Sequence, residues 1–241
     1  MGTYFVPSSG AVEAVKNAWK YSRGERSEVM IEYIKIETPF NRDTEGTKKL
    51  IEGSWRNETV DFLKDCQWVC TEKIDGTNIS VCWDGHKVTF NGRTERAAIP
   101  AHLMNRLIEM FGGDTNEEMF EQKFGEMPVI LYGEGYGAKI QNGGAYRPDV
   151  SFILFDVYLP SQEIWLTRDS VEDIAKAFGI DAVPIILVGT LQEAIDYVKA
   201  KPASTIGTAP MEGLVCRPVV ELYDRMGKRV IVKIKVKDFV Y

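Results

Sequence analysis

Short apolar runs that alternate with polar residues, or that end in glycine, asparagine or aspartate, recur along the chain and predict β-strands. Asp84-Gly85 separates two of these runs and predicts a β-hairpin. Asp224-Arg225-Met226-Gly227 predicts a second hairpin near the end of the chain. The predicted strands cover residues 29–36, 67–74, 79–83, 86–90, 129–133, 151–158, 184–188, 213–220 and 229–236, and a polar loop covers 38–47.

Between the strands, apolar residues at a spacing of three and four positions predict helices. In 101–111, Leu103, Leu107 and Phe111 would share one face, and Gly112 would end the helix. Thr190 and Glu193 have the spacing of a capping box, which predicts a helix over 191–199. Helices are also predicted over 11–21, 58–64 and 170–178, and the acidic stretches 114–126 and 163–173 are expected to be solvated helix faces.

Hairpins interrupted by helices are typical of an α+β fold rather than of a doubly wound parallel sheet. We therefore expect two antiparallel sheets with flanking helices that enclose a cleft. The chain has 241 residues, which suits one large domain with a sizeable core. A single domain is expected over residues 1–241, with residues 1–60 as an N-terminal extension packed on it.

Composition excludes several classes of protein. The apolar share of 44% and the charged share of 27% are ordinary for a soluble globular protein. No apolar run approaches the roughly 18 residues that cross a membrane, and the N-terminus lacks the basic and apolar segments of a secretion signal. We therefore expect no membrane contact and a cytoplasmic location. The net charge of -6 argues against a protein that coats nucleic acid non-specifically, although it leaves room for a local basic groove.

Cysteine and histidine usage predicts neither a zinc site nor a disulfide. The four cysteines have no CxxC spacing, and the chain has two histidines. Cys70 and Cys82 lie in apolar runs and are expected to be reduced core residues.

The strongest chemical signal is Lys73-Ile74-Asp75-Gly76, which follows a predicted strand. A lysine amine attacks phosphorus only when it is deprotonated, whereas the ordinary pKa of lysine is about 10.4. Nearby positive charge or burial favours the neutral amine. The alternating segment Val232-Lys233-Ile234-Lys235-Val236-Lys237 would place three ammonium groups on one face of a strand. We expect Lys73 to face that row and to act as a covalent nucleophile.

Lys73-Ile74-Asp75-Gly76 resembles the nucleotidyl-acceptor motif of the covalent nucleotidyltransferases, which include the ATP-dependent DNA and RNA ligases and the mRNA capping enzymes. Further resemblances follow in the family's order, and together they cover about two thirds of the chain. They are Gly92-Arg93-Thr94, Tyr132-Gly133-Glu134-Gly135, Phe152-Ile153-Leu154-Phe155-Asp156, Glu212-Gly213-Leu214-Val215 and Val232-Lys233-Ile234-Lys235. The glycine-rich segment 133–139 matches neither a P-loop nor GxGxxG, so a dinucleotide site is not predicted.

Within the family, Glu72-Lys73 followed by Gly76-Thr77-Asn78 is similar to RNA ligases of the phage and RNA-editing type. DNA ligases usually place an arginine two residues after the glycine, where this chain has Asn78. An RNA ligase is therefore favoured. Three alternatives stay open: a DNA ligase, a capping guanylyltransferase that uses GTP, and an inactive module that binds nucleotide or RNA.

The resemblance implies that the cleft binds ATP, that AMP becomes a covalent adduct of Lys73, and that Mg²⁺ or Mn²⁺ takes part. Lys233 and Lys235 would lie near the phosphates and stabilise charge on the transferring phosphoryl group. Glu212 would offer a carboxylate to the metal. AMP would then pass to a nucleic-acid 5′-phosphate, and a 3′-hydroxyl would displace it to seal the strand.

The resemblance also assigns residues to the base, the ribose and the nucleic acid. Phe155 would stack on the adenine, with Phe152 as the second candidate, while Glu134 and Arg93 would lie near the ribose. The remaining implied nucleotide-binding residues are Glu72, Asp75 and Gly76, and the implied nucleic-acid-binding residues are Asn78 and Lys139.

Most members of this family continue past the last lysine motif into an OB-fold or a helical domain, whereas this sequence ends at Tyr241. We expect no such C-terminal domain here. The chain is then either a minimal ligase or one that needs an accessory protein or domain to recognise ends. Residues 33–43, which include Asn41-Arg42-Asp43, are expected to contribute to substrate handling.

Overall fold

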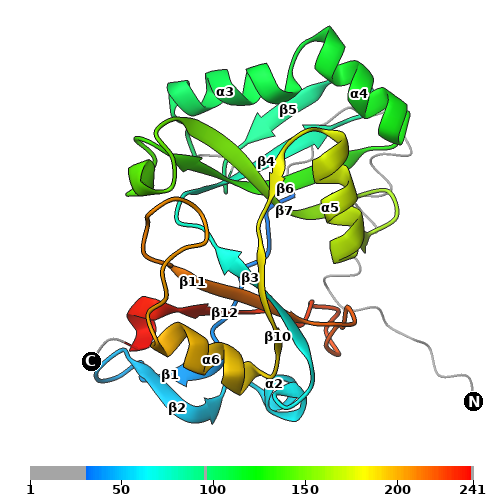
Figure 1. Ribbon diagram of the computed structural model, residues 1–241. Helices are drawn as coiled ribbons and strands as arrows, with labels where there is room; N and C mark the ends of the chain where they lie inside the picture. Colours follow the sequence, from blue (N-terminus) through cyan, green and yellow to red (C-terminus); the bar gives the residue numbers. More distant parts are fainter. Residues whose placement is uncertain (1–30, 95–96, 240–241) are drawn as a thin grey trace, which may run out of the picture.

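The computed structural model of the chain describes residues 31–94 and 97–239, and most of its strands lie in two sheets (Figure 1). The small sheet has the strand order β10-β3-β11-β12, and its neighbouring strands are antiparallel. Its strands are β3 (Trp68–Lys73), β10 (Ile185–Gly189), β11 (Gly213–Pro218) and β12 (Val232–Lys235). Because β11 pairs with both β3 and β12, it brings these two lysine-bearing strands to either side of itself.

The large sheet has the order β5-β4-β6-β7-β8, and the short strand β9 runs parallel to β7. The chain passes from the small sheet to the large one between Lys73 and Thr77, so this turn joins the two sheets. A separate two-stranded sheet pairs β1 (Phe40–Arg42) with β2 (Leu50–Trp55). The strands of the large sheet are β4 (Thr77–Trp83), β5 (Val88–Asn91), β6 (Val129–Gly137), β7 (Val150–Leu159), β8 (Ile164–Trp165) and β9 (Asp181–Ala182).

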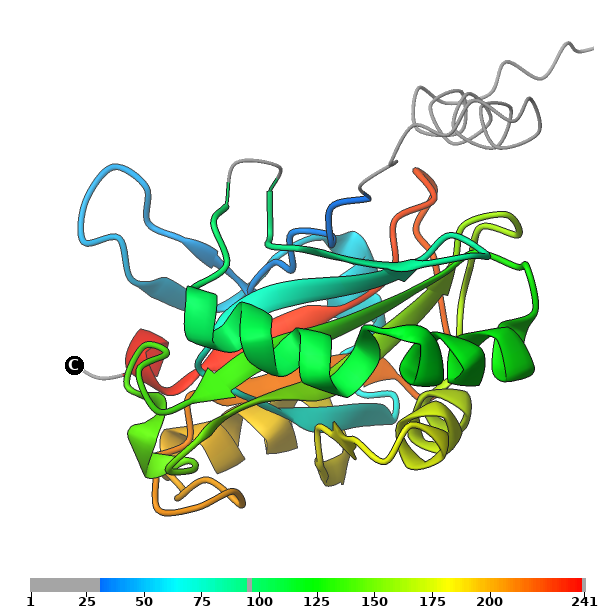
Figure 2. The same ribbon diagram turned by 90° about the horizontal axis from the view of Figure 1, so that it is seen from above.

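Helices cover the outer faces of both sheets (Figure 2). The large sheet packs against α3 (Ala101–Phe111), α4 (Asp114–Phe124) and α5 (Arg168–Ala177), and the small sheet against α2 (Glu58–Leu63) and α6 (Leu191–Lys199). Two short 3-10 helices are η1 (Gly143–Ala145) and η2 (Val236–Phe239). None of the helices in the described ranges is long and apolar enough to cross a membrane.

Three apolar clusters follow from this layering. One lies between the large sheet and its helices, and Phe111 and Phe120 are completely buried in it. A second lies between the small sheet and α6, around Trp68 and Leu191. A smaller third cluster contains Ile74, Ile153 and Val183, with the partly buried Phe155 packed against it. The third cluster packs beside the turn that joins the two sheets, so this junction is anchored by apolar contacts.

The structure confirms the α+β class and the antiparallel sheets. The predicted hairpin at Asp84-Gly85 joins β4 to β5, which pair antiparallel. The helix α6 begins with the predicted capping box: the Glu193 amide donates to Thr190 Oγ1 at 3.2 Å, and the Thr190 amide donates to Glu193 Oε2 at 2.7 Å. The helix α3 has the predicted bounds, and most of the acidic stretch 114–126 forms α4.

The N-terminal predictions were less accurate. Residues 31–36 do not form a strand, and Glu37 makes an isolated parallel bridge with Val232. The predicted polar loop contains β1, because the buried Phe40 ring packs against Trp55 at 4.6 Å between ring centres. One aromatic residue within a polar stretch leaves no periodic signal. The predicted helix over 11–21 and residues 29–30 lie outside the described residues.

Two strand predictions near the site also differ from the structure. The strand β6 continues through the glycines to Gly137, because these positions allow close packing: a Cβ atom at Gly133 would lie 2.2 Å from the Phe152 ring. Near the C-terminus the turn forms, with the Gly227 amide donating to the Asp224 carbonyl at 3.0 Å. The flanking strands are shorter than predicted, since β11 ends at Pro218 and β12 begins at Val232.

A buried charge network connects the two sheets. Asp156 on β7 is completely buried, and its carboxylate lies 3.5 Å from Arg217 on β11 and 2.6 Å from Arg229. Arg229 also binds Glu221 and stacks over Trp165, with 4.4 Å between the guanidinium carbon and the ring centre. Buried charges have to be paired, because transferring them from water is costly. Asp156 therefore holds both arginines and joins the large sheet to the small one.

We predict that Asp156→Ala lowers the free energy of unfolding by about 3–5 kcal/mol, because two arginines lose their buried counterion. Urea denaturation of parent and variant measures this loss. Asp149→Ala is the control, since Asp149 pairs with Arg147 at 2.7 Å while its side chain is 62% exposed. The Asp149 variant should unfold near the parent's midpoint, and equal midpoints for all three proteins would contradict the role of Asp156.

Candidate active site

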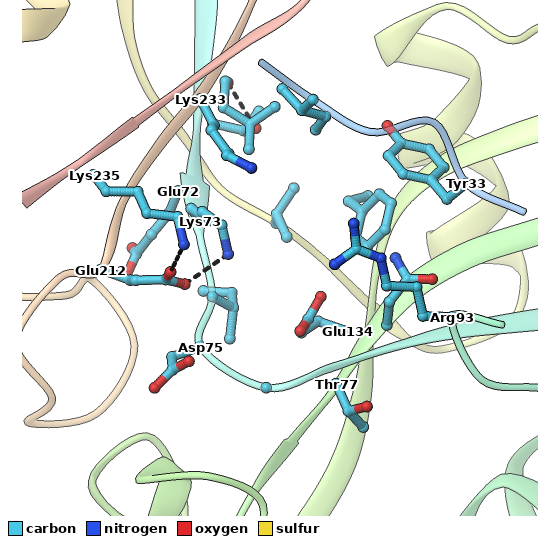
Figure 3. Close-up of a pocket in the computed structure, with 18 of the residues that line it drawn as sticks. Tyr33, Glu72, Lys73, Asp75, Thr77, Arg93, Glu134, Glu212, Lys233 and Lys235 are labelled. Atoms are coloured by element: carbon cyan, nitrogen blue, oxygen red, sulfur yellow. Dashed lines mark hydrogen bonds and ion pairs between the residues drawn. The ribbon is translucent and has the colours of Figure 1, made fainter. Parts of the chain in front are cut away.

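A cavity of about 380 Å³ lies between the two sheets at the turn that joins β3 to β4. Its lining combines strands from both sheets with residues of the segment that precedes β1. Figure 3 shows the polar side chains that point into it. The predicted residues that line it are Glu72, Lys73, Asp75, Gly76, Asn78, Arg93, Glu134, Phe155, Glu212, Lys233 and Lys235.

Lysines from two strands form one wall of the cavity. In the register of the small sheet, Lys73 and Lys235 lie on either side of Gly213. Lys233 lies two residues before Lys235, so it points to the same face of the sheet. A Cβ atom at position 213 would lie 2.0 Å from the Ile234 carbonyl oxygen, so a residue with a side chain does not fit between the two lysines. The prediction that Lys73 faces a row of three lysines is therefore confirmed for Lys233 and Lys235.

Lys237 does not belong to this row. The strand β12 ends at Lys235, and the chain continues as η2, so the alternation of side chains stops there. Lys237 is exposed and does not line the cavity. A sequence alternation gives no sign of where a strand ends, which explains the error.

Glu212 connects two of the lysines directly. Its Oε2 atom accepts a hydrogen bond from Lys73 Nζ at 2.6 Å, and its Oε1 atom lies 3.0 Å from Lys235 Nζ (Figure 3). All three side chains are less than one quarter exposed, at 23% for Lys73, 17% for Glu212 and 18% for Lys235. Limited exposure to water strengthens these charged contacts. Glu212 thus orients the Lys73 amine and balances part of the positive charge.

The surroundings of Lys233 are electropositive. Burial lowers its pKa from the ordinary value of lysine, and the neighbouring charges of Lys235, Lys73 and Arg93 lower it further. Glu37 acts in the opposite direction, but its effect is smaller. A negatively charged ligand would relieve this mutual repulsion, so the wall is prepared for an anion.

The turn between the sheets brings the Lys73 motif against β6. A Cβ atom at Gly76 would lie 2.3 Å from the Gly135 carbonyl oxygen and 2.8 Å from the Glu134 side chain. Glycine is therefore required at this position for the close approach of the two backbones. The Asp75 amide donates to the Tyr146 hydroxyl at 3.2 Å, which fixes the turn further. Asn78 follows on β4, directly opposite Glu134 on β6.

The Glu134 carboxyl group, which lines the cavity, has a raised pKa. Burial raises its pKa to about 8, and the charges of Glu212 and Asp75 add to this effect. Lys73 and Arg93 act against it but do not compensate. At neutral pH the group is therefore mainly a neutral acid, which can donate a hydrogen bond as well as accept one.

Apolar residues also line the cavity. Phe155 on β7 and Val215 on β11 line it from different sheets, and Val183 lies nearby in the same lining. Phe152, the second candidate for base stacking, is instead completely buried, with its ring edge-on to Phe111 at 5.3 Å. It occupies the core of the large sheet rather than the cavity.

Two predicted residues take other positions. Glu72 borders the cavity, but its carboxylate accepts hydrogen bonds from the Ser204 hydroxyl and from the amide and hydroxyl of Thr205. The group therefore anchors the loop before β11. Lys139 lies exposed after the end of β6 and does not line the cavity.

Several lining residues had no individual role assigned from the sequence. Val215 belongs to the motif Glu212-Gly213-Leu214-Val215, and Arg217 follows it by one further alternation on β11, so the strand period places both on the lysine face. Tyr33 belongs to the segment 33–43, which was expected to contribute to substrate handling, but no motif singled it out. Ile34 and Ile36, from the same segment, line the cavity as well.

The raised pKa of Glu134 predicts how the stability of the protein changes with pH. Its folded-state pKa of about 8 lies above the ordinary value, so between these pH values the folded protein binds a proton that the unfolded chain has released. The free energy of unfolding consequently falls as pH rises through this window. Glu134→Gln cannot ionise, so its stability relative to the parent should increase from about pH 5 to about pH 8 and then level off. Urea denaturation at several pH values measures the difference, and parallel profiles would contradict it.

The chemistry of the cavity suits a nucleotide. Three lysines lie along one wall, and the aromatic ring of Phe155 lines the same cavity. Within the described residues, no group of three or more histidine, cysteine, aspartate or glutamate side chains could hold a metal ion by itself.

Comparisons with known proteins agree with this geometry. Solved structures with a similar fold include mutants of the RNA ligase of Naegleria gruberi with ATP and Mn. One is 19% identical with a TM-score of 0.57, and the match covers 86% of this chain and 64% of that chain. Another is 20% identical with a TM-score of 0.62, covering 87% of this chain and 57% of that chain. This chain thus spans roughly three fifths of the length of those ligases.

At this level of identity the structural likeness concerns the fold. The comparison with curated protein sequences found no match. The model of the RNA ligase family matches residues 66–235, a range that includes Lys73, Glu134, Glu212 and both lysines of β12. Because this match covers more than half of the sequence, the chain belongs to the RNA ligase family.

Proposed function

We propose that this protein is an ATP-dependent RNA ligase that joins 5′-phosphate and 3′-hydroxyl ends through AMP attached to Lys73. The observation that carries the proposal is the position of Lys73. It lies on one wall with Lys233 and Lys235, in a cavity that Phe155 and Val215 also line. The membership of the RNA ligase family supports the choice of reaction.

ATP would lie with its adenine against Phe155 and its phosphates against the lysines. Phe155 and Val215 offer apolar surfaces from the two sheets, and an aromatic face favours stacking with a flat base. Glu134, protonated at neutral pH, could donate to a ribose oxygen, and Arg93 lines the same region. The polarity of the cavity therefore matches that of the nucleotide from end to end.

Adenylylation requires the Lys73 amine to exchange partners. In the described state Lys73 donates to Glu212, so it must release this carboxylate and lose a proton before it attacks. The attack forms a bond between Nζ and the α-phosphorus while the bond to the bridging oxygen breaks. Pyrophosphate leaves with that electron pair, and the nitrogen gives up a second proton. Lys235 and Lys233 would stabilise the charge on the phosphoryl oxygens.

A divalent cation would bind here through a carboxylate of the protein and through the phosphates of the substrate. Mg²⁺ commonly binds through one or two carboxylates, substrate phosphates and water. Glu212, once released from the lysines, offers such a carboxylate beside the position proposed for the phosphates. The ion would neutralise phosphate charge during the transfer.

The proposal is tested with α-labelled ATP and Mg²⁺, followed by denaturing electrophoresis. The parent should carry the label, and Lys73→Ala should carry none. Lys73→Arg should fail as well, because a guanidinium stays protonated and has no free lone pair. Lys123→Ala, which removes an exposed lysine of α4 far along the chain from these motifs, should label like the parent. Label on Lys73→Ala would refute the nucleophile, and label from GTP but not ATP would indicate a guanylyltransferase.

The choice of RNA over DNA rests on Asn78, whose amide has two donors and an acceptor for a sugar hydroxyl or phosphate. Asn78 lines the cavity on β4, shortly after the Lys73 motif. We predict that Asn78→Ala slows sealing more than it slows adenylylation of Lys73. Enzymes loaded with AMP are compared in single-turnover sealing of nicks whose 3′ side ends in RNA or DNA.

Equal sealing by parent and Asn78→Ala on both nicks would remove Asn78 from the sealing step. A parent preference for the nick that ends in DNA would replace the RNA ligase by a DNA ligase. Either result leaves the Lys73 chemistry intact, because loading is measured separately.

A further inference from the structure

The segment 31–37 runs along one side of the cavity and is held at both ends. The Tyr132 hydroxyl of β6 donates to the Ile31 carbonyl at 2.7 Å, and the Lys233 amide of β12 donates to the Glu37 carbonyl at 2.9 Å. The segment thus spans from the large sheet to the small one. It lies outside residues 66–235, which match the family model. Its residues Tyr33, Ile34 and Ile36 all line the cavity.

Tyr33 is the member of this segment that touches the ring proposed to stack on adenine. The rings of Tyr33 and Phe155 meet edge to face, with 5.0 Å between their centres and 69° between their planes. Tyr33 also packs against Tyr132 at 5.0 Å and edge to face against Trp165 at 5.5 Å. Tyr33, from the N-terminal segment, therefore joins an aromatic cluster whose other members, Phe155, Tyr132 and Trp165, belong to the large sheet. Its ring supports the Phe155 ring from this side.

The hydroxyl of Tyr33 fixes the ring in this orientation. It donates to Asp156 Oδ2 at 2.8 Å, and Asp156 directly follows Phe155 on β7. Burial and the Asp156 charge raise the pKa of Tyr33 well above its ordinary value, so the hydroxyl remains a donor. Arg217 contacts the same pair of residues, donating to the Phe155 carbonyl at 3.4 Å and lying 3.5 Å from Asp156. Tyr33 therefore contacts Phe155 through its ring and the following residue through its hydroxyl.

We propose that Tyr33 is a positioning residue that holds the Phe155 ring in its stacking orientation, and that segment 31–37 forms the outer wall of the base pocket. The inference rests on the proposed function, in which the cavity binds ATP with its base against Phe155. Tyr33 acts on the base end of the cavity, whereas the lysines that bind phosphate lie on another wall (Figure 3). Its loss should weaken binding of a ligand with a base and spare a ligand without one.

The test measures binding of AMP and of inorganic pyrophosphate separately by calorimetry, since neither ligand alone can adenylylate Lys73. Tyr33→Leu should weaken AMP binding roughly three- to tenfold, the range expected from one aromatic contact. Pyrophosphate binding should stay within about twofold of the parent, because its proposed contacts are the lysines. Tyr33→Phe keeps the ring and should recover most of the AMP affinity. A general loss of structure would weaken both ligands and would overturn the proposal.

Two further variants show whether Tyr33 acts through Phe155. The double variant Tyr33→Leu, Phe155→Leu should bind AMP no more weakly than Phe155→Leu alone, because the ring to be positioned is already absent. Additive losses would overturn the positioning role. Tyr158→Leu is the matched control, since Tyr158 packs on Trp165 at 4.7 Å but does not line the cavity, and it should bind AMP like the parent.

A failure of the inference on Tyr33 can be distinguished from a failure of the proposed ligase function. If Lys73 of the parent accepts label while Tyr33→Leu binds AMP like the parent, the inference on Tyr33 is wrong and the ligase proposal stands. If the parent binds neither AMP nor pyrophosphate, both are wrong.

Discussion

The buried carboxylate of Asp156 is the contact on which the arrangement of the two sheets depends. It belongs to the large sheet, and the arginines that neutralise it come from β11 and from the loop before β12. A charge without partners is very costly in the protein interior, so the ion pairs favour one separation of the sheets. Phe155 immediately precedes Asp156, so the same contact also sets where the ring proposed to stack on the base lies relative to the wall of lysines.

The position of Lys73 follows from the topology of the chain. It is the last residue of a central strand in one sheet, and the next strand belongs to the other sheet. Gly76 allows the connecting turn to pass closely beside β6, which carries Glu134. The proposed nucleophile therefore belongs to a rigid strand end, while neighbouring groups come from both layers. A site assembled in this way requires both sheets to be folded, since neither contains the complete set of lining residues.

Local patterns predicted the parts of the structure that depend on short-range rules. The capping box at Thr190 and the apolar stripe of α3 are of this kind, and so is the row formed by Lys233 and Lys235. The strand β6 runs past its predicted end at residue 133, because its glycines allow close packing against Phe152, a contact that no local pattern contains. The partners of Glu72 and Asp156 lie more than 60 residues away in the sequence, so neither contact had a signal. The contact of Tyr33 with Asp156 spans an even longer separation, so the sequence indicated the segment 33–43 but not this contact.

The bridge from Glu212 to Lys73 and Lys235 gives the cavity an internal competitor for anions. The carboxylate is part of the same chain and is held at contact distance, so its effective concentration at the two ammonium groups is high. A small monovalent anion that replaces it at one lysine leaves the other contact in place. An anion with several charged oxygens can replace both contacts at once. The bridge would therefore favour anions with several charged oxygens over simple monovalent anions, before any part of a base is recognised.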